Sequence, residues 1–168
     1  YSVVDAASIE MDDDSQLTSE SKTNAVVYNT ANDFEIHNGN INGIWRGIYV
    51  HGGTATINGG TVKSESSIGD NIAVYIDNNA SVIVNDGTIK AITNAPEDNP
   101  NGNANKITYG FNISSTKLKI NGGNFEVNGT SLNGTRAIIN TEGCAAINVE
   151  INDGNFISTH EEITGVTN

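Results

Sequence analysis

Several residue types are scarce in this chain, and each scarcity excludes a class of protein. The 168 residues include a single cysteine, Cys144, which excludes an intramolecular disulfide, and we interpret it as a small packed side chain. No apolar run approaches the roughly 20 residues that span a bilayer, so we expect no membrane insertion. The chain opens on strand-like residues without an initiator methionine, which predicts a processed or excised segment.

Basic side chains are scarce as well. Eight Lys and Arg stand against 20 Asp and Glu, which gives a formal net charge of −12. Proteins bind nucleic acids largely by neutralising phosphates with Lys and Arg, so we expect no nucleic acid partner. The same charge disfavours anionic membrane surfaces.

Large apolar side chains are less frequent than in an average globular domain. Hydrophobic residues make up 36% of the chain and aromatic residues 6%, whereas glycine occurs 18 times. Such a composition fits either a disordered chain or a fold that needs few large residues per turn. The regular repeat described next favours the second interpretation.

A six-residue motif recurs at intervals of roughly 20 to 36 residues. In each copy an apolar residue precedes a polar corner with Gly, then Thr or Asn, then another apolar residue. This order is typical of a strand, a tight turn and a second strand. The copies are Ile36–Ile41, Ile57–Val62, Val84–Ile89, Ile120–Phe125 and Ile151–Phe156.

Alternation of period two assigns side chains to an inner and an outer face. We align the segment ahead of each motif on a small residue, namely Ala25, Gly47, Ala73, Gly110 and Ala137. This alignment places Phe111 and Tyr28 in inward columns. It predicts a mixed outward column of Val27, Tyr49, Tyr75, Asn112 and Ile139. Within the motif, Ile120 points inward.

The corners of the motif carry two further expectations. The second position holds His37, Asn58, Asn85, Asn121 and Asn152, which we expect to stack as a hydrogen-bonded ladder, with His37 a variant of it. Gly60, Gly87 and Gly123 share the fourth position, and we expect positive φ there.

The sequence therefore predicts an all-β protein, a single right-handed three-sided parallel β-helix of about six coils. Residues 1–23 form an atypical first coil, 24–158 the regular coils, and 159–168 a C-terminal tail. A left-handed hexapeptide helix, a calcium-binding β-roll and leucine-rich repeats each require a period that this chain lacks.

Coils such as Ile57–Val62 and Val84–Ile89 resemble the pectin-lyase-like right-handed β-helices of bacterial secreted and surface proteins. The resemblance covers roughly residues 24–158. It implies an extracellular or cell-surface location and a role as an adhesin or carbohydrate-binding module. Because that superfamily also contains lyases, hydrolases and phage tailspikes, the resemblance leaves the function open.

Insertions concentrate at one corner of the predicted coils, after the third strand, and such stacked loops usually carry the function. Trp45 and Arg46 lie at this corner, where a flat aromatic beside polar groups suits a sugar ring. Tyr49 and Tyr75 add to this surface one coil apart, and Glu97 and Asp98 lie in its longest loop. The alternative is that Trp45 simply covers a neighbouring corner.

The run Asp12, Asp13 and Asp14 is the best candidate for an ion, because Ca²⁺ prefers clustered oxygen ligands. A solvated acidic edge is the alternative. We expect no required cofactor, with Ca²⁺ the one candidate.

These observations favour a non-catalytic extracellular module that binds a polysaccharide or cell-surface glycan through its loop edge. A structural stalk or fibre segment of a surface adhesin or virion is the second hypothesis, with self-association through the ends of the helix. A polysaccharide lyase or hydrolase ranks third, because the outward columns carry no paired carboxylates and His51 has no evident nucleophile.

Overall fold

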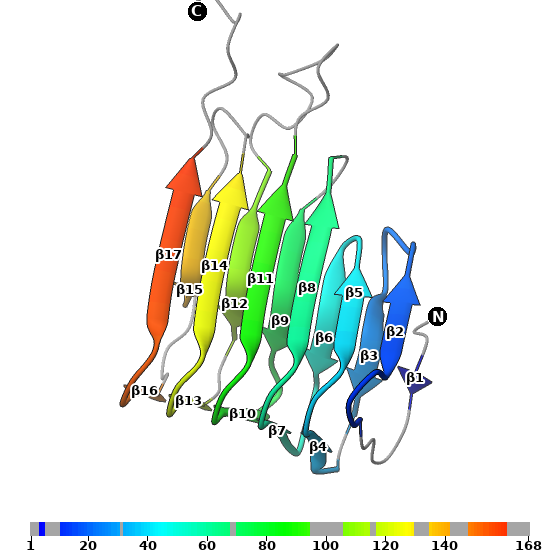
Figure 1. The fold of residues 1–168 in the computed structure, drawn as a ribbon, viewed down its shortest axis with the longest axis vertical. Helices are drawn as coiled ribbons and strands as arrows, with labels where there is room; N and C mark the ends of the chain where they lie inside the picture. The colour runs from blue at the N-terminus through cyan, green and yellow to red at the C-terminus, as the bar shows by residue number, and fades with distance from the viewer. Residues whose placement is uncertain are drawn as a thin grey trace, which may run out of the picture.

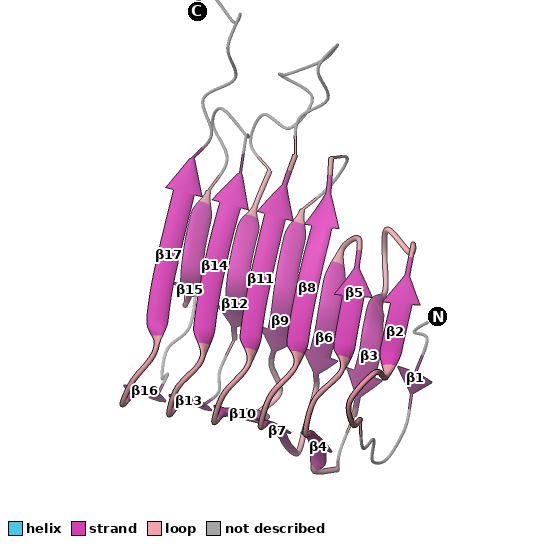
Figure 2. Ribbon diagram, viewed as in Figure 1, coloured by secondary structure: helices cyan, strands magenta, loops and turns pink. Residues whose placement is uncertain are grey.

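The computed structural model describes residues 4–5, 11–30, 32–67, 70–94, 106–114, 117–129, 135–141 and 148–160. Its regular secondary structure consists entirely of β-strands in the described ranges (Figure 2). The strands wind into coils that stack from β2 (Gln16–Ser19) to β17 (Asn155–His160) (Figure 1). In Figure 1 the strands at the front run up, the strands behind them run down, and the order along the chain advances from right to left, which makes the winding right-handed.

Three sheets form the sides of the column, and every strand pairing is parallel. Sheet A contains β1 (Val4–Asp5), β3 (Ala25–Asn29), β6 (Arg46–Val50), β9 (Asn71–Ile76), β12 (Thr108–Ile113) and β15 (Arg136–Asn140). Sheet C contains β4 (Phe34–Ile36), β7 (Thr54–Ile57), β10 (Ser81–Val84), β13 (Lys117–Ile120) and β16 (Asn148–Ile151). Sheet B contains β2 (Gln16–Ser19), β5 (Asn40–Gly43), β8 (Thr61–Ser66), β11 (Thr88–Thr93), β14 (Asn124–Gly129) and β17 (Asn155–His160). The arrangement confirms the predicted three-sided β-solenoid of about six coils.

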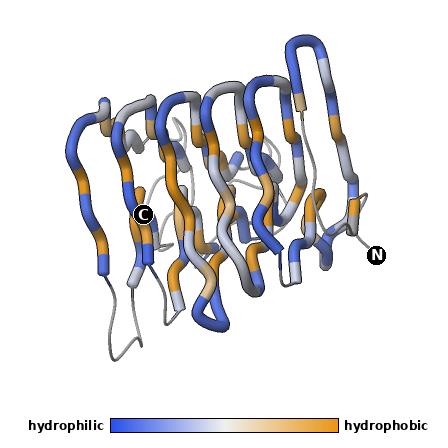
Figure 3. Tube along the Cα trace, turned by 90° about the horizontal axis from the view of Figure 1, so that it is seen from below, coloured by the Kyte–Doolittle hydropathy of each residue, from blue (hydrophilic) through white to orange (hydrophobic). Residues whose placement is uncertain are grey.

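The core is one continuous column of aliphatic and aromatic side chains between the sheets. Apolar and polar residues alternate along the strands and repeat from coil to coil (Figure 3). Phe111 and Ile120 have no exposed surface, as predicted, and the Phe111 ring lies 5.8 Å from that of Phe125. Each such side chain contributes about 1.5–3 kcal/mol by leaving water, so the stack of coils is held together mainly by this column.

The motif corners between sheets C and B have the expected geometry. Glycine occupies the fourth position with positive φ throughout, at Gly39, Gly60, Gly87, Gly123 and Gly154. At the second position of the motif, the side-chain amides of Asn85, Asn121 and Asn152 each donate to the Asn of the preceding coil, at 2.7, 2.8 and 2.8 Å. This confirms the predicted amide ladder from Asn58 onward. His37 holds the same motif position and lies 3.3 Å from Glu35.

The predicted register of sheet A is wrong by one residue in the coils of β3 and β15. Val27 pairs with Ile48, and Tyr28 pairs with Tyr49, so Tyr28 belongs to the outward column and Val27 is buried. In the same way Ile139 pairs with Phe111 and Asn140 with Asn112. The error arose because Ala25 and Ala137 are small but are not the counterparts of Gly47. Their larger neighbours Val26 and Ile138 take that position instead.

At the strand position of Gly47, small residues are required only in the middle coils. A Cβ on Gly47 would lie 2.7 Å from the side chain of Val62 and 2.8 Å from the carbonyl of Ala73. The same strand position admits Val26, which is fully buried in the core. Residue size alone is therefore an unreliable guide to the register.

No described segment forms a helix of the length and hydropathy needed to cross a membrane.

Candidate functional site

The outer side of sheet A carries a column of three tyrosines on successive coils. Tyr28 pairs with Tyr49, and Tyr49 pairs with Tyr75, which puts their side chains directly above one another. Both neighbouring ring pairs have centroids 4.9 Å apart, with interplanar angles of 55° and 89°. The rings are partly exposed and do not lie flat, so they present edges and hydroxyl groups as well as faces.

Trp45 lies on the short connector between β5 and β6. Its carbonyl accepts hydrogen bonds from the Ser64 hydroxyl at 3.0 Å and from the backbone N–H of Ile72 at 2.9 Å. The connector turns so tightly that a Cβ on Gly43 would lie 2.3 Å from the carbonyl oxygen of Arg46. The backbone around Trp45 is thus fixed to the next coil, and its indole is partly exposed.

Buried polar side chains support this corner from behind. The Asn71 amide donates to the Thr93 hydroxyl at 2.7 Å, and the hydroxyls of Thr93 and Thr108 lie 2.6 Å apart. Ser64 also contacts Asn71, at 3.3 Å. Because these groups are completely buried and bonded to one another, they rigidify the corner from which Trp45 projects.

Arg46 lies between aromatic rings of two coils. Its guanidinium carbon is 3.6 Å from the centroid of the Trp45 ring, 4.0 Å from that of Tyr75 and 5.1 Å from that of Tyr49. Its Nε is buried and makes no hydrogen bond. Burial lowers the pKa of Arg46, and the nearby Tyr75, Tyr49 and Asp77 oppose that shift. The side chain nevertheless stays a cation, since arginine keeps its proton in proteins.

Asp77 and His51 complete the surface at the ends of β9 and β6. The Tyr49 hydroxyl donates to Oδ2 of Asp77 at 2.7 Å, while Nδ1 of His51 lies 2.5 Å from Oδ1. A carboxylate only accepts, so we assign a proton to Nδ1 of His51. Burial first, and then the hydrogen bond and charge of Asp77, raise the pKa of Tyr49 well above its usual range.

We call this surface the aromatic face; it consists of Tyr28, Trp45, Arg46, Tyr49, His51, Tyr75 and Asp77. The structure brings together four residues that the sequence singled out: Trp45, Arg46, Tyr49 and Tyr75. Glu97 and Asp98, the other two candidates for ligand binding, lie outside the described residues. One side of the indole is covered by Arg46, so a sugar ring would have to pack on the opposite side or the edge.

Tyr28, His51 and Asp77 were not predicted as site residues, although spacing identifies the first. Tyr28 precedes Ile36 by eight residues, as Tyr49 precedes Ile57. For these two coils, counting back from the motif therefore gives the correct register. His51 and Asp77 directly follow the paired residues Val50 and Ile76, so their contact follows from the same register.

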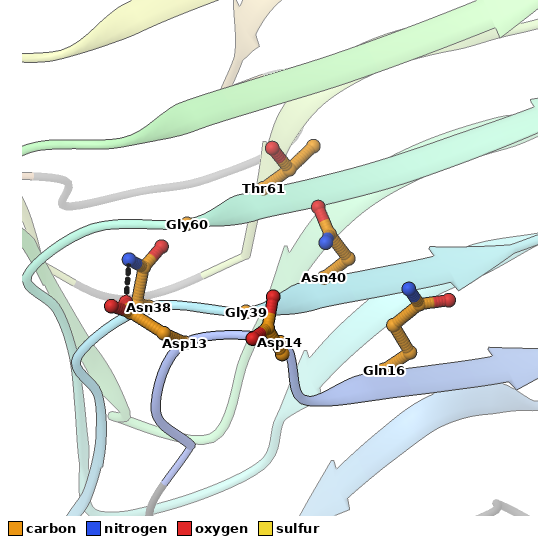
Figure 4. A pocket seen from close by; sticks show the side chains of 8 residues that line it. All are labelled: Asp13, Asp14, Gln16, Asn38, Gly39, Asn40, Gly60 and Thr61. Carbon is orange, nitrogen blue, oxygen red and sulfur yellow. Dashed lines mark hydrogen bonds between the residues drawn. The ribbon is translucent and has the colours of Figure 1, made fainter.

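The proposed Ca²⁺ ligands lie at the opposite corner of the column, in the first described coil. Asp13 and Asp14 border an open polar groove of about 520 Å³ with Gln16, Asn38, Asn40 and Thr61 (Figure 4). The Asp13 carboxylate accepts a hydrogen bond from the Asn38 amide. Within the described ranges, no three His, Cys, Asp or Glu side chains lie close enough to hold a metal ion. Ca²⁺ binding stays a prediction, and a rise in melting temperature with millimolar Ca²⁺ would test it.

Comparisons of the chain with family models, with curated proteins and with solved structures give no match.

Proposed function

We propose that the chain is a non-catalytic binding module that recognises a glycan through the aromatic face, outside the cell or at its surface. The observation that supports this most directly is the column of Tyr28, Tyr49 and Tyr75 beside Trp45. Sugar rings bind proteins by packing their C–H faces on aromatic rings while hydroxyl groups hydrogen-bond to polar side chains nearby.

The polar groups that such a ligand needs are present among the rings. The Asp77 carboxylate, the guanidinium of Arg46 and the Tyr49 hydroxyl all lie within the aromatic face. The strands beneath are central members of sheet A, between β1 and β15, so the surface is preorganised. Preorganised sites lose less conformational entropy when they bind. The resemblance to pectin-lyase-like adhesins and carbohydrate-binding proteins points in the same direction.

A glycan array followed by calorimetry tests the proposal. We expect the chain to bind at least one glycan class, and Trp45→Ala to weaken that binding by about tenfold or more, as for a central aromatic anchor. Ile83→Ala, a half-exposed aliphatic residue on the outer side of sheet C, is the matched control and should leave binding unchanged. A dark array, or equal losses in both variants, would refute the proposal.

The second candidate function is a structural one, as a stalk or fibre segment of an adhesin or virion. It is favoured by the exposed apolar side chains of the last described coil, Ile151, Phe156 and Ile157. A silent array together with an elongated oligomer would favour this alternative.

A further inference from the structure

Tyr49 differs from the other two tyrosines of the aromatic face in what its hydroxyl contacts. This hydroxyl donates a hydrogen bond to Oδ2 of Asp77 at 2.7 Å. In the part of the chain that the structure describes, the hydroxyls of Tyr28 and Tyr75 contact no carboxylate. Among these three stacked rings, Tyr49 alone therefore has a described base in hydrogen-bond contact with its phenol.

His51 holds the same carboxylate from its other side. Nδ1 of His51 lies 2.5 Å from Oδ1 of Asp77, so the two carboxylate oxygens are engaged by different groups. Oδ2 faces the phenol at a distance suited to proton transfer, which requires roughly 2.6–3.2 Å between the heavy atoms. The arrangement is thus prepared for a reaction in which Tyr49 loses its proton.

One-electron oxidation of the phenol is such a reaction. Loss of an electron makes the hydroxyl strongly acidic, so the proton leaves together with the electron. Asp77 can accept this proton directly, and the products are a neutral tyrosyl radical, a protonated Asp77 and the reduced oxidant. A base positioned in this way typically accelerates a reaction by about 10²–10⁴-fold.

Arg46 has the opposite effect on the ring of Trp45. Its guanidinium carbon lies 3.6 Å from the indole centroid, where it is attracted by the electron density of the ring. Removal of an electron from the indole would place two positive charges at this short distance, and they would repel each other. Tryptophan and tyrosine are in general oxidised at similar potentials, so this contact makes Trp45 the poorer electron donor of the two.

The same cation does not oppose oxidation of Tyr49. Arg46 lies further from its ring, 5.1 Å from the centroid, and the tyrosyl radical is neutral once Asp77 has taken the proton. The ring of Tyr49 is also partly exposed, so that small oxidants reach it. Tyr109 in β12, by contrast, is buried.

We propose that Tyr49 is a site of one-electron oxidation, at which small radical oxidants remove an electron while Asp77 takes the proton, and that Arg46 protects Trp45 from the same oxidants. The modification is a tyrosyl radical at one defined position of the aromatic face. This inference does not depend on the proposed glycan-binding function.

The first test uses the unaltered chain and locates the radical. A photoexcited ruthenium tris-bipyridine complex with persulfate supplies the one-electron oxidant, and a nitroso spin trap converts side-chain radicals into covalent adducts. Peptide mass spectrometry identifies the residues that carry them. We expect the main adduct on Tyr49. A main adduct on Trp45, or equal adducts on all three tyrosines of the column, would overturn the inference.

The second test measures the rate at which the photogenerated oxidant is consumed. Asp77→Asn keeps a hydrogen-bond acceptor but removes the base, so oxidation should slow by about tenfold or more, as it should in Tyr49→Phe. Asp86→Asn removes an exposed carboxylate at a motif corner, and Tyr109→Phe removes a buried phenol; both are controls that should keep the rate. Equal rates for the unaltered chain and folded Asp77→Asn would overturn the inference.

Deuterated water distinguishes proton transfer from a merely structural hydrogen bond. If the proton moves with the electron, the unaltered chain should react more slowly in deuterated water than in ordinary water. Identical rates in the two solvents would overturn the role of Asp77 as the base.

Arg46→Gln tests the protection of Trp45. Without the cation at its face the indole should become a second site of oxidation, so that adducts appear on Trp45 as well as on Tyr49. Lys63→Gln, which removes a cation from the outer side of sheet B, is the control and should leave the adduct pattern unchanged. An unmodified Trp45 in folded Arg46→Gln would overturn the protective role of Arg46.

Discussion

Tyr49 connects the parts of the aromatic face. Its ring contacts Tyr28 and Tyr75 at 4.9 Å, and its hydroxyl donates to Asp77 at 2.7 Å. Arg46 lies 5.1 Å from the centroid of its ring. Tyr49 thus belongs to the column of tyrosines and also contacts Asp77 at the strand ends. Ionisation of its hydroxyl is therefore sensitive to both.

The first prediction concerns ionisation of Tyr49. Burial and the Asp77 carboxylate raise its pKa in the folded state, so the folded chain retains a proton that the unfolded chain loses near pH 10. The stabilisation is complete below about pH 10 and is lost as the pH rises further. An ultraviolet titration of tyrosinate should show that Tyr49 ionises later than is usual for tyrosine.

Asp77→Asn should lower the pKa of Tyr49 towards its usual range, because it removes a negative charge and keeps a hydrogen-bond acceptor. Asp86→Asn, at an exposed corner of the column, is the control and should not alter the titration. Simultaneous ionisation of all phenols near pH 10 would contradict the contact between Tyr49 and Asp77.

The second prediction concerns the motif corner. Gly87 has φ of +107°, and a Cβ there would lie 2.9 Å from the carbonyl oxygen of Gly60 in the preceding coil. Gly87→Val should therefore cost about 1–2 kcal/mol or more in the free energy of unfolding. Chemical denaturation measures this, with the adjacent strand residue changed by Thr88→Val as control. Equal stability of the two variants would show that the corner tolerates a side chain.

At the scale of elements, the central strands carry the stability of the coils. β12 pairs with β9 on one side and β15 on the other, and Phe111 in its middle is completely buried. A carboxylate at this position would have no partner in the column.

The third prediction is that Phe111→Asp abolishes cooperative folding, since an unpaired buried charge costs at least several kcal/mol. Phe111→Ala, which leaves a cavity, should cost about 3–5 kcal/mol. Circular dichroism and thermal melting measure both. Asn112→Asp is the matched control, because Asn112 points outward and its Oδ1 accepts from Asn140. A normal melt of Phe111→Asp would mean that β12 has a different register.

The motif made the elements predictable, and the register of sheet A shows where prediction failed. Ile57–Val62 and its equivalents contain both strand ends and the corner, so sheets B and C followed from sequence spacing. Sheet A lacks such a motif, and the small residues Ala25 and Ala137 gave a shift of one residue. A shift of one exchanges the inner and outer sides, so Tyr28 was placed in the core.

The candidate site was predicted only in part for the same reason. Trp45, Arg46, Tyr49 and Tyr75 were found because they are rare side chains near one corner. The contact between His51 and Asp77 joins residues 26 positions apart and depends on the register of β6 and β9. The cation–π contacts of Arg46 depend on side-chain directions that spacing does not determine.

At the scale of the whole molecule, the column has two ends that differ from its middle. Among the described strands, β15, β16 and β17 are the last of the three sheets, and each has a described neighbour on one side only. Side chains that face inward in other coils are exposed there, with Ile151 at 49% and Phe156 at 37%. Unpaired strand edges beside exposed apolar groups favour pairing with another chain.

The last prediction is that the chain self-associates through the end formed by β15, β16 and β17. The N–H and C=O groups of these strands can extend the parallel sheets into a second copy, and Ile151 and Phe156 would be covered by its coil. Sedimentation velocity at several concentrations should show larger, elongated species as concentration increases. Phe156→Glu should weaken this association, because it places a charge on the apolar end. Ile83→Glu, on the side of the column, should not. A monomer at every concentration would refute the prediction and would also remove the main support for a fibre-forming role, since coils that do not stack end to end cannot build length.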